Sequence, residues 1–119
     1  MTLPLIYIAG PFRGPTPYDV HRNVCAAESW GLTVARLGGY PVIPHTMTQH
    51  FDKQLTDEFW LEGTMEMLRR CDAVILMDSW RRSTGAQAEA TEARRLKIPV
   101  FEDPYNLEQW ISAWKANRG

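Results

Sequence analysis

The fold of this chain is decided by the segment Leu3-Pro4-Leu5-Ile6-Tyr7-Ile8-Ala9 and by the glycines and prolines that follow it. The apolar run has the length of a buried strand, and the Gly10-Pro11 turn and its successors predict a loop after it. A helix should begin at Asp19 or a near neighbour and end at Gly38-Gly39. This order of strand, loop and helix recurs along the chain, and it indicates an α/β protein whose parallel sheet is covered on both faces.

Three more strands are expected, at Tyr40–Ile43, Ala73–Met77 and Pro99–Phe101. Helices should run from Asp57 to about Asp72, from about Gly85 to Leu96, and after Asp103-Pro104. Residues 46–55 are polar without a clear period, which predicts a long loop beside the site. The pattern contains no repeat and no linker.

Length and composition predict a single domain over residues 1–119. The formal charge is −1 and the basic residues form no stripe, so a polymeric nucleic-acid partner is not expected. Cys25 and Cys71 lie inside apolar patterns, which suits reduced core thiols of a cytoplasmic protein. No metal-ligand spacing, cofactor motif, leader or membrane-spanning run is present, so we expect a soluble protein without metal or cofactor.

Two loops are candidates for ligand binding because each follows a predicted strand and precedes a predicted helix. They are Gly10-Pro11-Phe12-Arg13-Gly14 and Ser83-Thr84-Gly85-Ala86. In an open parallel sheet both lie at the carboxyl edge, where ligands bind. Glycines admit a ligand close to the backbone, and Arg13 offers a planar fork of donors to an anion. The first loop alone equally fits an ordinary connector, because it has neither a dinucleotide glycine pattern nor a Walker lysine.

Glu89 is the acid in the least expected place. If Thr84 caps the helix and Gln87 closes a capping box, the inward stripe consists of Ala86, Glu89, Ala90 and Ala93. A carboxylate on such a stripe loses hydration, and its pKa rises unless donors compensate. The alternative is a place at the rim of the stripe, bonded to a neighbouring loop. Glu92 should point outward and be merely solvated.

Other polar residues allow two interpretations each. Tyr7 either fills core or brings its hydroxyl to the end of the first strand. His45 follows the second strand and either faces a ligand or caps a loop. Asp57 either points across the cleft or belongs to a solvated helix side with Glu58, Glu62 and Glu66. Trp110 and Trp114 fit core or a subunit contact better than a stacking platform.

An ordered series of motifs resembles a known family. The series comprises Ile6-Tyr7-Ile8-Ala9-Gly10-Pro11, Asn23, Ile43-Pro44-His45, Cys71-Asp72-Ala73-Val74, Ser79-Trp80 and Ser83-Thr84-Gly85-Ala86 with Glu89. It is similar to the nucleoside 2-deoxyribosyltransferase-like superfamily and, more closely, to its DUF4406 branch. The resemblance implies a Rossmann-like, flavodoxin-type three-layer sandwich with a four- to five-stranded parallel sheet. It also implies cleavage of the N-glycosidic bond of a nucleoside or nucleoside 5′-monophosphate, by a hydrolase or a base-exchanging deoxyribosyltransferase.

The resemblance assigns roles to residues of this chain. Glu89 corresponds to the nucleophile, and Tyr7 to a tyrosine that places it. Substrate binding is implied for Gly10, Pro11, Arg13, Gly14, Asn23, His45, Ser83, Gly85 and Ala86. Family members are commonly oligomers, so a homodimer or higher homo-oligomer is expected, with a small nucleoside or nucleotide as its ligand.

One position departs from the family pattern. Many members carry an aspartate, thought to pass a proton to the leaving base, where this chain has Thr64. Either another acid such as Asp57 or Asp78 supplies the proton, or activity is altered or lost. The alternative to an enzyme is therefore a non-catalytic nucleotide-binding or sensing module, and a third is an interaction domain that docks a partner on the Trp110 and Trp114 helix. Arg13, with help from Arg81 or His45, would favour a 5′-monophosphate.

Overall fold

The sheet is parallel and four-stranded in the computed structural model, which describes residues 2–48, 50–51 and 54–118. Its strands are β1 (Leu5–Ala9), β2 (Tyr40–Val42), β3 (Ala73–Leu76) and β4 (Val100–Phe101), in the order β2-β1-β3-β4. This order is that of flavodoxin-type sheets, in which the chain leaves β1 in one direction and then the other. The predicted α/β, Rossmann-like fold is confirmed, with the lower of the two expected strand numbers.

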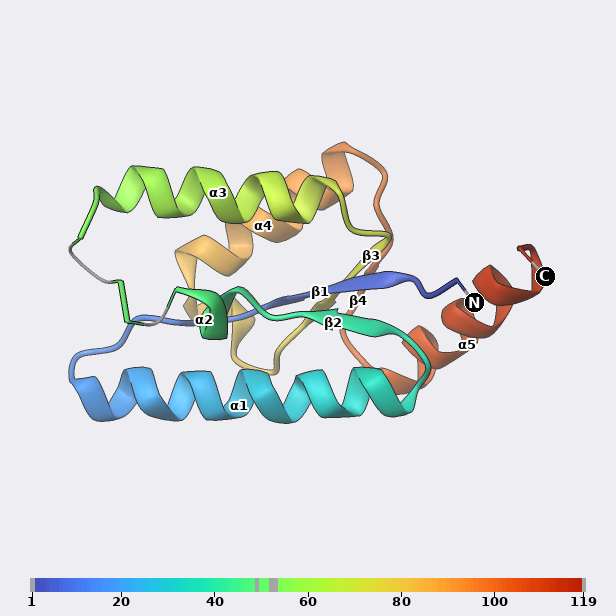
Figure 1. Cartoon of the computed structure of the whole chain (residues 1–119), viewed down its shortest axis with the longest axis horizontal. Coiled ribbons are helices and arrows are strands. Elements are labelled where there is room, and N and C mark those ends of the chain that lie inside the picture. The colour runs from blue at the N-terminus through green and yellow to red at the C-terminus, as the bar shows by residue number, and fades with distance from the viewer. Residues whose placement is uncertain (1, 49, 52–53, 119) are drawn as a thin grey trace.

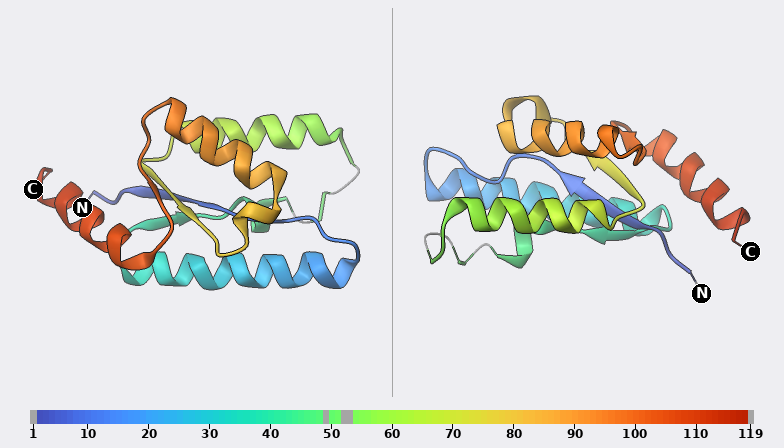
Figure 2. Two further views of the ribbon diagram at one scale, coloured as in Figure 1. Left: turned by 180° about the vertical axis from the view of Figure 1, so that it is seen from behind. Right: turned by 90° about the horizontal axis from the view of Figure 1, so that it is seen from above.

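Helices cover both faces of the sheet (Figures 1 and 2). On one face lie α1 (Pro17–Arg36) and α5 (Pro104–Ala116), and on the other lie α3 (Asp57–Arg69) and α4 (Thr84–Arg95). Alternation along β1 explains this arrangement, because Ile6 and Ile8 pack with α1 and α5 while Tyr7 and Ala9 pack with α3 and α4. The buried core residues of α5 are Leu107 and Ile111. None of the helices within the described ranges is long and apolar enough to cross a membrane.

The helix starts follow local capping. Thr16 accepts a hydrogen bond from the backbone N–H of Asp19 and closes a capping box with it, so α1 begins two residues before Asp19. At α4 the predicted Thr84–Gln87 box is wrong. Ser83 is the N-cap and accepts from the N–H of Ala86 at 3.1 Å, while the Gln87 side chain donates to the carbonyl of Arg81. Ser83 has the extended backbone that an N-cap requires, one residue earlier than expected.

Two other expectations are corrected. The predicted loop over residues 46–55 starts inside a short helix, α2 (Pro44–Met47), because proline suits the first helical position; residues 49 and 52–53 lie outside the described ranges. Cys25 is exposed, since it lies about 100° around α1 from the buried Val24. Cys71 is buried as expected.

Candidate active site

A cavity of about 620 Å³ opens at the carboxyl edge of the sheet, a volume typical of small-molecule sites. Its walls are the segments that follow β1, β2 and β3 together with the N-terminal parts of α3 and α4. This is the point where the strand order reverses, the usual binding crevice of open α/β sheets. Of the residues singled out from the sequence, the cavity is lined by Gly10, Pro11, Arg13, His45, Asp57, Thr64, Ser83, Gly85, Ala86 and Glu89.

Glu89 and Tyr7 form the buried centre of the site. Tyr7 is completely buried on β1, and its hydroxyl donates a hydrogen bond to the Glu89 carboxylate on α4. Burial raises the pKa of Glu89 to about 7, and the Tyr7 hydrogen bond opposes this rise. Burial and the neighbouring Glu89 carboxylate raise the pKa of Tyr7 far above its ordinary value, so the phenol keeps its proton. The cavity therefore presents a poorly hydrated carboxylate held by one neutral donor.

Thr64 lies beside this pair, on the inward side of α3. Its hydroxyl donates to the Leu61 carbonyl at 2.9 Å, and its interaction with Tyr7 lowers the pKa of that phenol in part. Thr64 lines the cavity together with Glu89. A threonine hydroxyl is too weak an acid to protonate a leaving group at neutral pH.

His45 holds the loop that follows β1. Its Nε2 lies 3.2 Å from the Gly10 carbonyl oxygen and 3.1 Å from that of Pro11, so this nitrogen carries a proton and donates it. Burial lowers the pKa of His45, which makes the ring neutral at physiological pH. Gly10 is required there because a Cβ would lie 2.8 Å from the Cβ of Met77. His45 and Gly10 both border the cavity, and both hold the loop after β1 in place.

Two residues implied as substrate ligands are placed away from the cavity lining. The Asn23 side-chain amide donates to the carbonyls of Phe12 and Arg13, at 3.1 and 3.2 Å. Gly14 approaches Asp19 so closely that a Cβ would collide with its side chain. Asn23 and Gly14 therefore shape the loop that presents Arg13, and neither borders the cavity.

Arg13 reaches across the mouth of the cavity to Asp57, the first residue of α3. Its two terminal nitrogens donate to the two carboxylate oxygens at 3.0 and 2.7 Å. This contact keeps the pKa of Asp57 below its ordinary value. Of the interpretations of Asp57, the structure shows the one in which it points across the cleft. Asp78 is exposed and does not line the cavity.

Aromatic and cationic residues that the sequence did not identify as site residues complete the walls. Trp60 lines the cavity one turn before Thr64, and its ring meets Phe59 edge to face at a centroid distance of 5.0 Å. Trp60 lies four residues before Thr64, and this spacing places both residues on one helix face. The spacing could have indicated a site residue, but it fits a core residue equally well. Arg82, not Arg81, borders the cavity, from the 3₁₀ helix η1 (Trp80–Arg82) that precedes α4.

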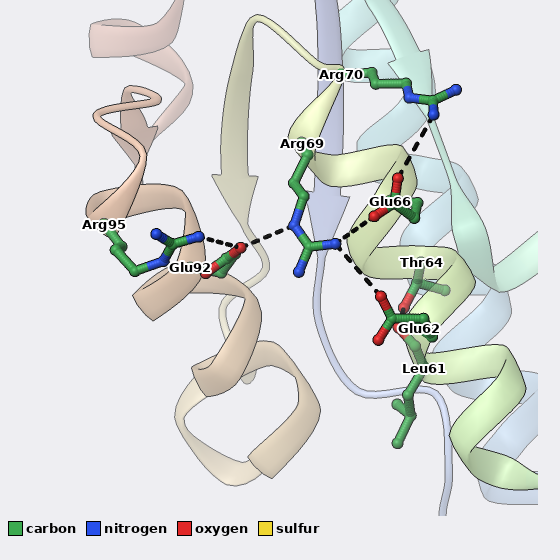
Figure 3. A network of polar contacts seen from close by, with 8 residues as sticks. All are labelled: Leu61, Glu62, Thr64, Glu66, Arg69, Arg70, Glu92 and Arg95. Carbon is green, nitrogen blue, oxygen red and sulfur yellow. Dashed lines mark hydrogen bonds and ion pairs between the residues drawn. The ribbon is translucent and has the colours of Figure 1, made fainter.

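An ion network ties α3 to α4 (Figure 3). Arg69 on α3 contacts Glu62 and Glu66 of its own helix and Glu92 of α4, the last at 2.9 Å. The expectation that Glu92 is merely solvated is wrong, because its side chain is only 14% exposed and pairs with Arg69 and Arg95. Hydrogen bonds from these guanidinium groups lower the pKa of Glu92 to about 2, and the bond from Arg95 has the larger effect. The network lies one helical turn from Glu89, so it joins the two helices that border the cavity.

Comparison with solved structures places this fold in a known class. The chain is similar to a 2-deoxyribosyltransferase from the psychrotolerant bacterium Bacillus psychrosaccharolyticus, with a TM-score of 0.63 and 18% identity over 87% of this chain and 90% of that one. At this identity the similarity shows a shared fold. The sequence itself matches the model of the family described as "Domain of unknown function (DUF4406)" over residues 4–102, and the chain belongs to that family. No curated protein matches it.

Proposed function

We propose that the protein cleaves the N-glycosidic bond of a nucleoside or nucleoside 5′-monophosphate through a covalent intermediate on Glu89. The observation that carries the proposal is the buried Tyr7–Glu89 pair at the wall of a nucleoside-sized cavity. A poorly hydrated carboxylate is a better nucleophile than a solvated one, and perturbed carboxyl groups in clefts are typical of catalytic sites. The fold shared with a 2-deoxyribosyltransferase agrees with this chemistry.

The reaction has two displacements. In the first, a Glu89 oxygen forms a bond to C1′ of the sugar while the bond from C1′ to the base nitrogen breaks, and the base leaves with the electron pair. In the second, water or another base attacks C1′ and releases the Glu89 carboxylate, as in retaining glycosidases. Water gives a hydrolase, and it loses its proton to the solvent or to the departing carboxylate. A second base gives a transferase.

Proton delivery to the leaving base is the weak step of this site. Among the described residues that line the cavity, the carboxyl groups are those of Asp57 and Glu89. Arg13 keeps Asp57 ionised, and Glu89 must itself be ionised to attack. Because neither of these carboxyl groups of the described lining can deliver a proton, we expect the proton to come from solvent and the reaction to be slowed by about a hundredfold.

The test is release of free base by the wild type, Glu89→Gln and Glu58→Gln, measured by mass spectrometry with a panel of nucleosides and their 5′-monophosphates. Glu58 is an exposed acid of α3 outside the cavity lining, so Glu58→Gln is the matched control. We expect base release by the wild type and the control and none by Glu89→Gln. Equal release by Glu89→Gln would remove the nucleophile from the proposal.

A second candidate is a nucleotide-binding module without turnover, and Thr64 in the cavity is the observation that favours it. Such a module would keep the pocket and lack the acid that protonates the leaving base. Calorimetric binding of a nucleoside or nucleotide by the wild type, without any base release during prolonged incubation, would decide for it.

We also propose a homo-oligomer, because Phe59 and Leu61 of α3 are more than half exposed. Light scattering tests this proposal.

A further inference from the structure

The guanidinium of Arg13 is already occupied at the cavity mouth. Both of its terminal nitrogens bind the carboxylate of Asp57, at 3.0 and 2.7 Å, in the parallel two-bond geometry of an arginine–carboxylate pair. Both residues line the cavity, although they lie 44 positions apart in the sequence. The pair therefore joins the loop after β1 to the first turn of α3 directly at the opening.

A phosphate monoester binds an arginine through the same two donors that a carboxylate uses. A substrate phosphate that approached Arg13 would have to displace the Asp57 carboxylate or bind next to it, where the two negative charges repel each other. We propose that Asp57 is a specificity-determining residue that disfavours a 5′-phosphate, so that the site selects the uncharged nucleoside over its 5′-monophosphate. This inference rests on the proposed function, and it assigns the substrate class of that site.

Two other charged side chains among the described lining residues bear on phosphate binding, Glu89 and Arg82. Glu89 at the inner wall is acidic and repels a phosphate whenever it is ionised. Arg82 borders the cavity from the 3₁₀ helix that precedes α4, and besides Arg13 it is the guanidinium among the described lining residues. Arg82 offers a phosphate a second route, so the experiment must separate it from Arg13.

The size of the effect follows from exposure. The side chains of Arg13 and Asp57 are 60% and 58% exposed, so water screens the pair and a phosphate can compete for Arg13. Removal of the Asp57 charge eliminates the competition of this carboxylate for Arg13 and its repulsion of the phosphate. We expect it to tighten binding of a 5′-monophosphate by about fivefold to tenfold relative to the matching nucleoside.

The test measures dissociation constants by isothermal titration calorimetry in a Glu89→Gln background, so that turnover does not consume the ligand. The ligands are the common nucleosides and deoxynucleosides, each paired with its 5′-monophosphate. The proteins carry Asp57→Asn, Asp57→Asn with Arg13→Met, or Glu58→Gln as the control, which removes a neighbouring charge from the same helical turn. A further protein carries Arg82→Gln.

We expect the Glu89→Gln protein to bind the nucleoside more tightly than its 5′-monophosphate. Asp57→Asn should shift the ratio of these two dissociation constants toward tighter binding of the monophosphate. Adding Arg13→Met should abolish that shift, and Glu58→Gln should leave the ratio unchanged. An unchanged ratio in Asp57→Asn, a shift that survives Arg13→Met, or a monophosphate preference in the background protein that Arg82→Gln abolishes would each overturn the inference. The proposed function fails separately, through absence of base release from the wild type with every ligand.

Discussion

Replacing Glu89 with glutamine should remove a pH-dependent loss of stability that the buried carboxylate imposes on the wild type. Burial raises the pKa of Glu89 from 4.5 to about 7 in the folded protein. At about 1.4 kcal/mol per pH unit, this rise corresponds to a cost of about 3 kcal/mol for keeping the group ionised in the native state. Glutamine resembles the protonated acid in shape, and its carbonyl oxygen can still accept the Tyr7 hydrogen bond.

The direction in which the free energy of unfolding changes with pH follows from proton binding. Because the folded pKa lies above the unfolded value, the native state retains the Glu89 proton at pH values where the unfolded chain has lost it. The resulting stabilisation is complete below about pH 4.5 and is lost as the pH rises to about 7. Glu89→Gln has no proton to lose at this position. The free energy of unfolding of the variant should therefore equal that of the wild type near pH 4 and exceed it by about 3 kcal/mol at pH 8.

The assay is urea unfolding followed by tryptophan fluorescence at several pH values between 4 and 8, for the wild type, Glu89→Gln and Glu58→Gln. Both variants lose one carboxylate, but only Glu89 is buried, so the control curve should run parallel to the wild-type curve. A constant difference between Glu89→Gln and the wild type across the whole range would refute the reasoning, because it would mean that Glu89 titrates alike in both states.

Three further substitutions test the surroundings of Glu89. Tyr7→Phe removes the donor that lowers the pKa of Glu89, so the acid limb of the pH profile for base release should move to higher pH; a shift to lower pH would contradict this. Thr64→Asp places a carboxyl group beside the pair and should speed base release by about a hundredfold while moving the same limb upward, as measured by steady-state kinetics across pH. Arg69→Met should lower the thermal midpoint by several degrees more than Arg70→Met, because Arg69 bridges two helices and Arg70 contacts its own helix; equal midpoints in calorimetry would show that the bridge is silent.

Much of the fold was predictable because its determinants are local. Alternating residues of β1 must face opposite sides of the sheet, so Ile6 and Tyr7 were bound to enter different layers. The alanine stripe of α4 likewise set the direction of Glu89, because the helical period is independent of which residue caps the helix. The Ser83 cap shifted the start of the helix by one residue and left the stripe unchanged.

The errors arose where neighbouring residues compete or where a partner lies far away. Cys25 and Val24 are adjacent in an apolar pattern, and the inward face of α1 takes Val24 and leaves Cys25 exposed. Glu92 looked solvated because its partner Arg69 lies on another helix, 23 residues earlier. Composition says nothing about such a pairing.

The chain's own periodicity thus determined the α/β sheet, the inward direction of Glu89 and the two loops at the carboxyl edge, because strand and helix geometry repeat over a few residues. Tertiary structure decided that Tyr7 contacts Glu89, 82 positions away in the sequence, and that Arg13 donates two hydrogen bonds to Asp57. Those contacts depend on how whole helices settle against the sheet. The packing energy that settles them is summed over many side chains, so no short segment encodes it.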